Sequence, residues 1–327
     1  YPLKQRPCLP GYCTFGRAVQ LCLFNLSAGD KVKNHMQQAG ADSLSGAGVD
    51  YRRRHLLKLL AGSPLVLSQL FGAKLVYAAG GIKPGIQLYT VRQLMQQDIA
   101  ATLRLLAGLG YQEVEFAGLF EHSATAVAAW LAEYGLSAPA GHVMLQPMLA
   151  DTNRVLDEAL ALGHRYLVMP YLFEHERNDG LRSYQQLAEQ LNRVGERCQA
   201  LGLQLAYHNH DFEFAVIDNT TPYEILLTQT DATLVKMEID LYWAAKMQVD
   251  VPALFSRYPG RFPLWHLKDM AADGNFADLG TGSINFTAVA KAASVAGLQH
   301  AFVERDTTDN VQRTLQQGLR GFKQIFS

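Results

Sequence analysis

A single alternation, repeated along most of the chain, limits the possible folds more than any other feature of the sequence. Short apolar runs alternate with longer stretches whose apolar residues recur at spacings of three and four, the period of an amphipathic helix. We expect strands at residues 85–90, 113–117, 137–143, 166–170, 203–209, 234–240, 262–268 and 301–305. We expect helices between them, among which are residues 99–109, 125–134, 152–162, 184–201 and 286–296.

A glycine follows several of the helical stretches and leads into the next strand, at Gly110, Gly135, Gly163, Gly202 and Gly297. Glycine at this place is a common helix stop, because it adopts the left-handed backbone conformation without steric cost. The repeat of helix, glycine and short apolar strand predicts a parallel sheet. Eight such units in about 250 residues favour closure into a barrel over an open sheet. The sequence therefore predicts an α/β fold, a (β/α)8 TIM barrel that spans residues 79–327 as a single catalytic domain.

A signal-like segment, residues 51–78, precedes the barrel. It begins with a basic run that contains Arg53 and Arg54, continues with an apolar stretch and ends at Ala78. That order is typical of a secretory signal, and the paired arginines favour the twin-arginine type. We therefore expect periplasmic localisation; if the segment is instead an amphipathic helix with a basic start, the protein is cytoplasmic. Glycine, serine and proline interrupt the apolar stretch, which argues against a stable membrane span.

Residues 1–50 carry no clear period, so we expect a non-structural N-terminal extension. An over-extended gene start, with Met36 as the true initiator, is our hypothesis for them. Of the 29 basic and 30 acidic residues, 10 basic and 3 acidic lie in residues 1–78, which leaves the barrel with a net charge of about −8. An acidic body argues against a nucleic-acid partner. Cys198 is the only cysteine after residue 78, so no disulfide is expected within the barrel.

The ends of the strands carry the residues for chemistry, since TIM barrels place their active sites there. The fifth to eighth runs each end with a side chain that binds metals, and these are His208, Asp240, His266 and Glu304. Side chains alternate along a strand, so His208 and His210 share a face, as do Glu238 and Asp240, and neighbouring strands lie about 4.8 Å apart. One inward residue from each strand could therefore meet at one divalent ion. The mixed nitrogen and oxygen set suits Mn²⁺, Zn²⁺, Co²⁺ or Mg²⁺.

Three polar residues at strand ends, Gln87, Glu115 and His142, are candidates for substrate binding, and Trp243 is a further candidate that could stack on a sugar. For Glu115 and His142 the alternative is a satisfied polar group in the upper barrel. Lys268 could hold a substrate oxygen or a developing enediolate, or else form a salt bridge with Glu304 or Asp240. Glu213 could support a histidine ligand or be a surface charge in its loop.

Four sequence blocks carry a family resemblance: Gly85-Ile-Gln-Leu-Tyr-Thr-Val-Arg92, Tyr207-His-Asn-His-Asp-Phe-Glu-Phe214, His266-Leu-Lys-Asp269 and Phe302-Val-Glu304. They resemble the sugar phosphate isomerase/epimerase family, the xylose isomerase-like barrels, and the resemblance spans residues 84–327. It implies one divalent metal bound by Glu, Asp, His and Glu on strands five to eight. Asp240, His266 and Glu304 match that set, whereas His208 stands where the first Glu would be. Gly280-Thr281-Gly282-Ser283 resembles the substrate loop of the family.

The resemblance implies a metal-dependent isomerase or epimerase acting on a sugar or keto-sugar by proton abstraction next to a carbonyl group. The catalytic candidates are Glu304, His208 and His210 as bases and Lys268 as the residue that stabilises negative charge. In epimerases of the family two metal-bound glutamates on opposite sides of the substrate act as a pair of catalytic bases. This chain keeps only one of them, Glu304. A lyase, hydrolase or dehydratase of keto-glycosides through the same chemistry is therefore the main alternative, and a non-catalytic sugar-binding barrel is another. In each case the expected partner is a small sugar.

Overall fold

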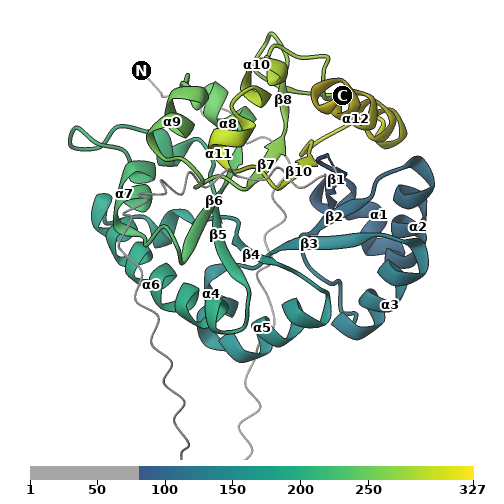
Figure 1. Ribbon diagram of the computed structural model, residues 1–327, viewed down its shortest axis with the longest axis horizontal. Coiled ribbons are helices and arrows are strands. Elements are labelled where there is room, and N and C mark those ends of the chain that lie inside the picture. Colours follow the sequence, from purple (N-terminus) through teal and green to yellow (C-terminus); the bar gives the residue numbers. More distant parts are fainter. Residues whose placement is uncertain (1–80) are drawn as a thin grey trace, which may run out of the picture. The chain divides into compact units, whose positions relative to one another are not determined.

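Parallel strands form at the apolar runs, and each is short because a polar or glycine-containing turn follows it. The computed structural model describes residues 81–327, so the extension and the signal-like segment lie outside the described residues. The eight barrel strands are β1 (Pro84–Gln87), β2 (Glu113–Phe116), β3 (Ser137–His142), β4 (Tyr166–Met169), β5 (Gln204–His208), β6 (Val235–Asp240), β7 (Leu264–Leu267) and β10 (His300–Val303). They close in the order β1-β10-β7-β6-β5-β4-β3-β2, all parallel (Figure 1). The predicted TIM barrel is confirmed.

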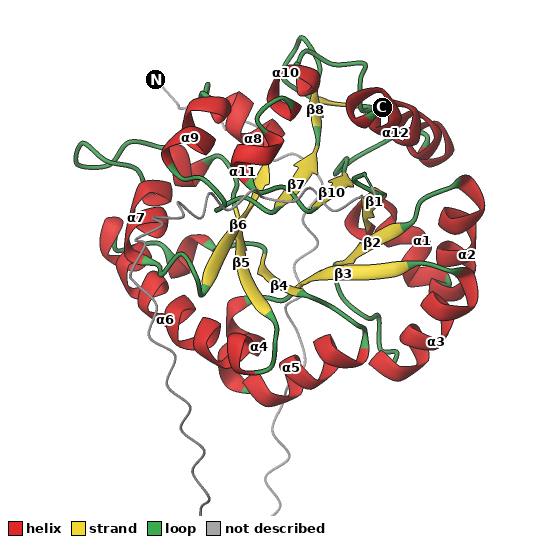
Figure 2. Ribbon diagram, viewed as in Figure 1, coloured by secondary structure: helices red, strands yellow, loops and turns green. Residues whose placement is uncertain are grey.

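Helices surround the strands, as Figure 2 shows. They are α1 (Arg92–Gln97), α2 (Ile99–Leu109), α3 (Ala124–Tyr134), α4 (Leu145–Ala150), α5 (Thr152–Ala161), α6 (Leu181–Ala200), α7 (Pro222–Gln229), α8 (Leu241–Lys246), α9 (Val251–Arg257), α10 (Phe286–Ala290), α11 (Ala293–Ala296) and α12 (Val311–Phe326). Short 3-10 turns, η1 (Leu88–Val91), η2 (Glu174–Glu176) and η3 (Phe212–Phe214), follow three of the strands. After β7 the chain forms a small antiparallel hairpin from β8 (Asp269–Met270) and β9 (Phe276–Ala277). Among residues 81–327, no helix combines the length and the apolar character needed to cross a bilayer.

Local signals in the sequence explain where the helices begin and end. The Asp98 carboxylate caps α2 by accepting a hydrogen bond from the Ala101 N–H at 2.8 Å. Gly110 ends the same helix with a φ of 108°, as its place in the sequence predicted. The prediction of one helix over residues 286–296 was wrong, since the chain turns there and forms α10 and α11. The last carbonyls of α11 are used elsewhere: Ala296 accepts a hydrogen bond from the Phe262 N–H at 3.0 Å, which docks the helix end beside β7.

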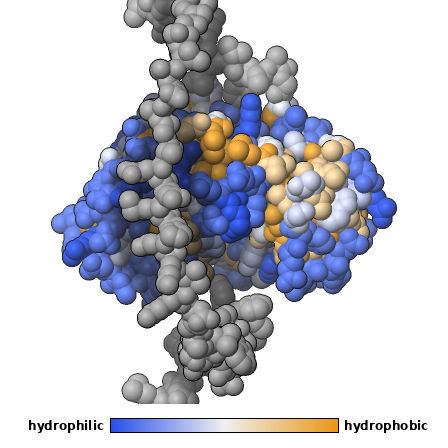
Figure 3. Space-filling view, turned by 90° about the horizontal axis from the view of Figure 1, so that it is seen from below, coloured by the Kyte–Doolittle hydropathy of each residue, from blue (hydrophilic) through white to orange (hydrophobic). Residues whose placement is uncertain are grey.

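The core has two parts. The larger part lies between the helices and the outer faces of the strands. The smaller part fills the barrel itself with inward-facing side chains, namely Ala140, Tyr166, Val168, Ala206, Leu264 and Phe302. This apolar layer closes the barrel below the strand ends, so polar side chains there meet on a floor without water access. Figure 3 shows one side of the helical layer, where hydrophilic residues dominate and hydrophobic residues form separate patches.

Gly321 lets α12 pack closely on the loop that follows β9. A Cβ atom at Gly321 would lie 2.6 Å from the Leu279 carbonyl oxygen and 2.8 Å from the Leu279 Cγ. Real Cβ atoms do not approach backbone so closely, and the position therefore requires glycine. The contact fixes the last helix against the segment that carries Asp278, whose carboxylate accepts a hydrogen bond from the Thr314 hydroxyl at 2.6 Å.

Candidate metal centre

The ends of four neighbouring strands, β5, β6, β7 and β10, bring the predicted ligands to one place. His208, Asp240, His266 and Glu304 are all buried, with at most 6% of each residue exposed. Asp240 lies opposite His266 in the β6–β7 register, and His208 lies opposite Glu238 in the β5–β6 register. This stagger divides the cluster into two groups at different depths, which share His266.

The upper group consists of Asp240, His266 and Glu304, whose ligand atoms all lie within 4.8 Å of one another. The Nδ1 atom of His266 is 2.9 Å from Oε2 of Glu304. Asp240 caps α8, because its Oδ1 accepts hydrogen bonds from the Tyr242 and Trp243 N–H groups at 2.8 and 3.0 Å. Its other oxygen, Oδ2, is buried and has no hydrogen-bond partner. Capping thus aims one free carboxylate oxygen at the centre of the group.

The deep group consists of His142, His208, Glu238 and His266, and its ligand atoms also lie within 4.8 Å of one another. The Oε2 atom of Glu238 is 2.8 Å from Nε2 of His142, 3.2 Å from Nδ1 of His208 and 3.2 Å from Nε2 of His266. Glu238 was not among the predicted ligands. The signal that could have found it was its spacing of two from Asp240, which places both side chains on the inner face of β6.

His208 stands between the two groups. Its Nε2 is 3.9 Å from Oδ2 of Asp240, while its Nδ1 lies beside Glu238 without a hydrogen bond. Burial, together with the neighbouring His266 ring, lowers the pKa of His208 to about 3, so the imidazole is neutral. A neutral imidazole is the form that binds metals.

His266 contacts carboxylates through both ring nitrogens. Its Nε2 lies 2.6 Å from Oε2 of Glu115, opposite the Nδ1 contact with Glu304. Burial opposes a charge on this ring, but Glu238, Glu304 and Glu115 together raise its pKa well above the ordinary value. Without an ion, the ring therefore carries both of its protons.

Of the residues that we expected to contact the substrate, His142 is a member of the deep group, and Gln87 and Glu115 lie beside it. Gln87 and Glu115 are completely buried, and the Gln87 amide donates to Oε2 of Glu115 at 2.8 Å. The Gln87 Nε2 also lies 3.4 Å from Nε2 of His142. The structure thus places these residues around the histidines rather than on an open surface.

Lys268 supplies a positive charge to the upper group. Its ammonium lies 3.2 Å from Oε2 of Glu304, 3.4 Å from Oδ2 of Asp240 and 2.5 Å from Oδ1 of Asp306. Burial disfavours the charge, but the three carboxylates outweigh it and raise the pKa of Lys268 above its ordinary value. Asp306 was not predicted, because it lies beyond the last strand. The only signal in the sequence was its spacing of two residues from Glu304.

The carboxylates of the upper group differ in proton affinity. Burial raises the pKa of Asp240 to about 7, and nearby Lys268 offsets only part of that effect. For Glu304 burial acts in the same direction, but Lys268 and His266 together hold its pKa well below the ordinary value. Glu304 is therefore ionised at neutral pH, whereas Asp240 titrates near neutrality when no ion is bound.

His210 and Trp243 form an aromatic wall at the mouth. The His210 ring centroid lies 4.8 Å from that of Tyr171 and 5.4 Å from that of Trp243. Burial and the neighbouring His208 and Lys268 lower the pKa of His210 well below its ordinary value, and its Nδ1 has no hydrogen-bond partner. The Trp243 ring centroid is 5.2 Å from the Lys268 ammonium, and its Nε1 is buried without a partner.

Glu213 anchors the turn that carries His210. It is completely buried, and it accepts hydrogen bonds from the Tyr207 hydroxyl at 2.6 Å and from the His210 N–H at 2.8 Å. Burial raises the pKa of Glu213 to about 7, although both hydrogen bonds lower it. Glu213 is therefore not a surface charge, and it holds the backbone of His210, a residue outside both groups of potential ligands.

Asp269 organises the glycine loop that resembled a substrate loop. Its Oδ2 accepts hydrogen bonds from the Gly280 N–H at 2.9 Å and from the Gly282 N–H at 2.8 Å. A Cβ atom at Gly282 would collide with the Asp269 carboxylate and the Met270 carbonyl oxygen. The glycine here permits a close approach to Asp269 rather than to a phosphate.

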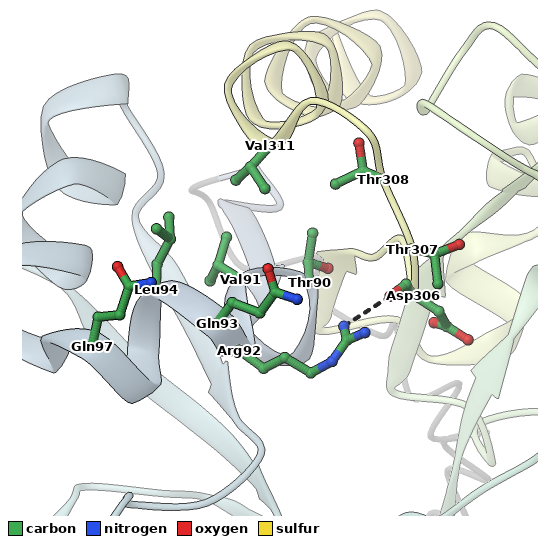
Figure 4. Close-up of a pocket in the computed structure, with 10 residues that line it drawn as sticks. All are labelled: Thr90, Val91, Arg92, Gln93, Leu94, Gln97, Asp306, Thr307, Thr308 and Val311. Atoms are coloured by element: carbon green, nitrogen blue, oxygen red, sulfur yellow. Dashed lines mark hydrogen bonds between the residues drawn. The ribbon is translucent and has the colours of Figure 1, made fainter. Parts of the chain in front are cut away.

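A pocket lies at the rim, between the loop that follows β1 and the loop that follows β10 (Figure 4). It is lined by Thr90, Val91, Arg92, Gln93, Leu94, Gln97, Asp306, Thr307, Thr308 and Val311. The Arg92 guanidinium crosses it and donates from Nη1 to the Asp306 carbonyl oxygen at 2.8 Å and to the Tyr89 carbonyl oxygen at 2.9 Å. The pocket borders the upper group through Asp306.

The donor set suits a divalent metal ion. Two carboxylates and an imidazole converge in the upper group, and a buried oxygen of Asp240 makes no hydrogen bond and lies 3.4 Å from the Lys268 ammonium. Such an oxygen is costly unless something positive binds it. Mixed oxygen and nitrogen donors are compatible with Mn²⁺, Zn²⁺, Co²⁺ or Mg²⁺. The residues present therefore fit an ion of this class.

Comparison with known proteins agrees with the fold. Residues 103–325 match the family described as xylose isomerase-like TIM barrel. An inosose dehydratase from Geobacillus kaustophilus (strain HTA426) is 25% identical over 191 residues, which cover 51% of this chain and 61% of that protein. An inosose dehydratase from Lacticaseibacillus casei is 30% identical over 87 residues, 27% of this chain and 28% of the relative. The chain thus spans less than two thirds of the length of these relatives.

Solved structures with the same fold include two of interest for the metal centre. A sugar phosphate isomerase/epimerase from Parabacteroides distasonis ATCC 8503 is 25% identical with a TM-score of 0.63, covering 75% of this chain and 94% of that one. The IOLI protein, whose crystal structure holds a zinc atom, is 16% identical with a TM-score of 0.59, covering 75% and 98%. The second likeness concerns the fold alone.

Proposed function

Because the chain belongs to the xylose isomerase-like TIM barrel family, we propose that it is a divalent-metal-dependent enzyme. It removes a proton from the carbon next to the carbonyl group of a sugar, keto-sugar or related polyhydroxylated ketone. The upper group holds the ion, with His208 as a further ligand above Glu238. The observation that carries the proposal is the convergence of the buried donor atoms of Asp240, His266 and Glu304, among which Oδ2 of Asp240 makes no hydrogen bond.

A bound divalent ion supplies a Lewis acid that lowers the pKa of the C–H group next to a carbonyl. The chain supplies the rest. Lys268, held protonated by Glu304, Asp240 and Asp306, donates hydrogen bonds to the substrate oxygen on which negative charge develops. Such a donor in a site sheltered from water stabilises the transition state more than the ground state. Trp243 provides a flat apolar face beside Lys268 for the ring of the substrate.

Two groups are unprotonated at neutral pH and can accept the substrate proton. Glu304 is ionised because Lys268 and His266 outweigh its burial. His210 is neutral, and its Nδ1 has no partner within the described residues. We propose Glu304 as the base and His210 as the residue that hydrogen-bonds a substrate hydroxyl, with the reverse assignment as the alternative.

We propose elimination as the step that follows proton removal. The base breaks the C–H bond, the electron pair forms a C=C bond, and the C–O bond at the next carbon breaks. The leaving oxygen takes the proton that the base removed and departs as water or an alcohol, so the base returns to its starting state. His208 supports this reading, since epimerisation needs a base on each face of the substrate and His208 stands where a second carboxylate would be. The resemblance to inosose dehydratases points the same way.

Isomerisation or epimerisation is the second candidate. It is favoured by the likeness to the sugar phosphate isomerase/epimerase of Parabacteroides distasonis, which covers nearly all of that protein. The twin-arginine-type segment supports a periplasmic location in either case, and there the substrate would be an unphosphorylated sugar or glycoside. Recovery of the protein from a periplasmic extract of its host, cleaved after Ala78, tests the location; an uncleaved cytoplasmic chain would contradict it.

The reaction is tested with the full chain after chelation and reloading with Mn²⁺, Zn²⁺, Co²⁺ or Mg²⁺. Keto-sugars, inososes and 3-keto-glucosides are supplied in D2O and followed by NMR. An unsaturated ketone, with release of water or an aglycone, supports elimination. Deuterium in an otherwise intact sugar supports the isomerase or epimerase. Turnover that survives both chelation and Asp240→Asn would exclude a metal-dependent reaction, and ion binding without turnover would leave a sugar-binding barrel.

A further inference from the structure

We propose that the deep group, His142, His208, Glu238 and His266, forms a second divalent-metal site beneath the upper one. The nitrogen-rich donor set suits Zn²⁺ or Co²⁺. Glu238 lies two residues before Asp240 on the inner face of β6, so the deep group lies one layer further into the barrel. It rests on residues that the proposed reaction does not use as acid or base, although His266 belongs to both groups and His208 lies beside both Asp240 and Glu238.

The donor atoms already have the spacing of a metal site. In a tetrahedral zinc site, with bonds of about 2.0–2.1 Å, neighbouring donor atoms are roughly 3.3–3.4 Å apart. Oε2 of Glu238 lies 3.2 Å from the nitrogens of His208 and His266 and 2.8 Å from that of His142. The three imidazole nitrogens thus surround one carboxylate oxygen, and all four donor atoms lie within 4.8 Å of one another, so that side-chain adjustment can bring them around one ion.

Unpartnered polar atoms also point to an ion. The Oε1 atoms of Glu115 and Glu238 and the Nδ1 atom of His208 are buried and make no hydrogen bond. Glu115, Glu238 and His266 have no exposed surface at all. Buried polar atoms of this kind are normally paired, so three in one cluster require an explanation.

The charges of the two groups differ. In the upper group the Lys268 ammonium faces the carboxylates of Asp240 and Glu304. In the deep group, the ion pairs that Glu115 and Glu238 make within residues 81–327 are all with imidazoles. These two buried carboxylates thus lack a permanent cation, and a divalent ion would provide one without a Lys or Arg.

His266 links the sites, because Nδ1 faces the upper group and Nε2 faces the deep group. A ring that binds ions through both nitrogens has released both of its N–H protons. Oε2 of Glu115, 2.6 Å from Nε2, is placed to accept the second proton. The donor atoms of the two sites also differ: the upper group offers two carboxylates and one imidazole, and the deep group one carboxylate and three imidazoles. Mg²⁺ prefers oxygen donors, so we expect it to fill only the upper site.

The test is the number of ions per chain, which needs no enzyme assay. The full chain is stripped with a chelator, loaded with excess ZnCl2, desalted and measured by elemental analysis. We expect two zinc ions in the wild type and one in Glu238→Gln, His142→Asn and Asp240→Asn. Circular dichroism melting of each variant checks that it is folded, and His142→Asn provides a second deep variant if Glu238→Gln does not fold.

The outcomes separate this proposal from the proposed function. One zinc ion in the wild type that Asp240→Asn loses and both deep variants keep would overturn the deep site and leave the reaction untouched. One ion that the deep variants lose and Asp240→Asn keeps would support the deep site and contradict the upper one. Cobalt loading provides an independent readout, since loss of Glu238 should remove one set of visible d–d bands while the other remains.

Discussion

The ammonium of Lys268 and the carboxylate of Glu304 lie 3.2 Å apart at the mouth of the barrel, in the place where a metal ion is proposed to bind. The positive charge of Lys268 stabilises negative charge on the substrate but opposes binding of a metal ion. Two positive charges held close together repel strongly in a buried site.

Replacement of Lys268 should therefore separate ion binding from catalysis. In Lys268→Met we expect turnover to fall by about 100-fold or more, as for the loss of one donor to a developing oxyanion. We expect ion affinity to rise by about tenfold, because a competing charge has gone. Isothermal titration with Mn²⁺ measures the ion affinity, and a turnover assay measures the catalytic rate. Lys268→Arg, which keeps the charge, should keep the wild-type affinity; equal affinities in both variants would refute the competition.

Ion affinity should depend on pH through Asp240. Its pKa is raised to about 7, and only the ionised carboxylate binds metal, so protonation competes with the ion below neutrality. We expect Asp240 to lower the affinity by up to about tenfold for each pH unit below 7, and His266, which must release a proton to bind an ion, to add to this dependence. Titrations between pH 5.5 and 8.5 test this. Asp211→Asn, at the exposed residue paired with Lys246, serves as the control and should keep the profile; a flat wild-type profile would contradict the assignment.

Glu213 should make the fold less stable as the pH rises. Its pKa is about 7 in the folded protein and ordinary in the unfolded chain, so folding favours the protonated form. Its contribution is complete below the unfolded pKa and is lost as the pH rises to about 7. From a shift of this size we estimate a loss of roughly 3 kcal/mol.

The Glu213→Gln variant removes this titration and should reduce the stability difference between pH 5 and pH 8 by a similar amount. Urea unfolding at both pH values measures it. Glu196→Gln, on the exposed side of α6, is the matched control and should leave the difference unchanged. A Glu213→Gln variant with the wild-type pH dependence would show that another group is responsible.

Two glycine-to-alanine changes in helices should have opposite effects. Gly321→Ala places a methyl group 2.6 Å from the Leu279 carbonyl oxygen, and we expect a loss of about 1–3 kcal/mol of stability. Gly108→Ala in α2 meets no atom within 4 Å and should stabilise the fold by about 0.5–1 kcal/mol. Thermal unfolding of both variants measures the two changes in stability. Equal effects would mean that the close contact of α12 with Leu279 does not contribute to stability.

The sequence predicted the strands well because each combines an apolar run with a glycine or polar stop. The predicted strand at residues 234–240, for instance, corresponds to β6 at Val235–Asp240. Short elements such as α8 and α9 give too few turns for a helical period to be seen. The β8–β9 hairpin has only two residues in each strand, and no alternation can be recognised at that length.

The position of the site was predictable from the sequence, but its two layers and the participation of Glu238 and Asp306 were not. Strand ends identified His208, Asp240, His266 and Glu304, yet the register that turns His208 toward Glu238 is a tertiary property. Asp306 could not be placed from the sequence, because a loop residue has no fixed face. The two-residue spacing between Glu238 and Asp240 was visible, but it does not tell a buried ligand from a structural carboxylate.

The seam between β1 and β10 has a consequence for how the protein is made. The pairing of Ile86 with Val303 joins the first described strand to the last, so a ribosome must deliver nearly the whole barrel before the seam can form. A nascent chain that lacks β10 has two open strand edges and no Glu304. Ion capture at the upper group therefore becomes possible only after the last strand has arrived. Binding of the proposed ion would thus distinguish a finished chain from a truncated one, and it would stabilise the completed barrel against opening by mass action.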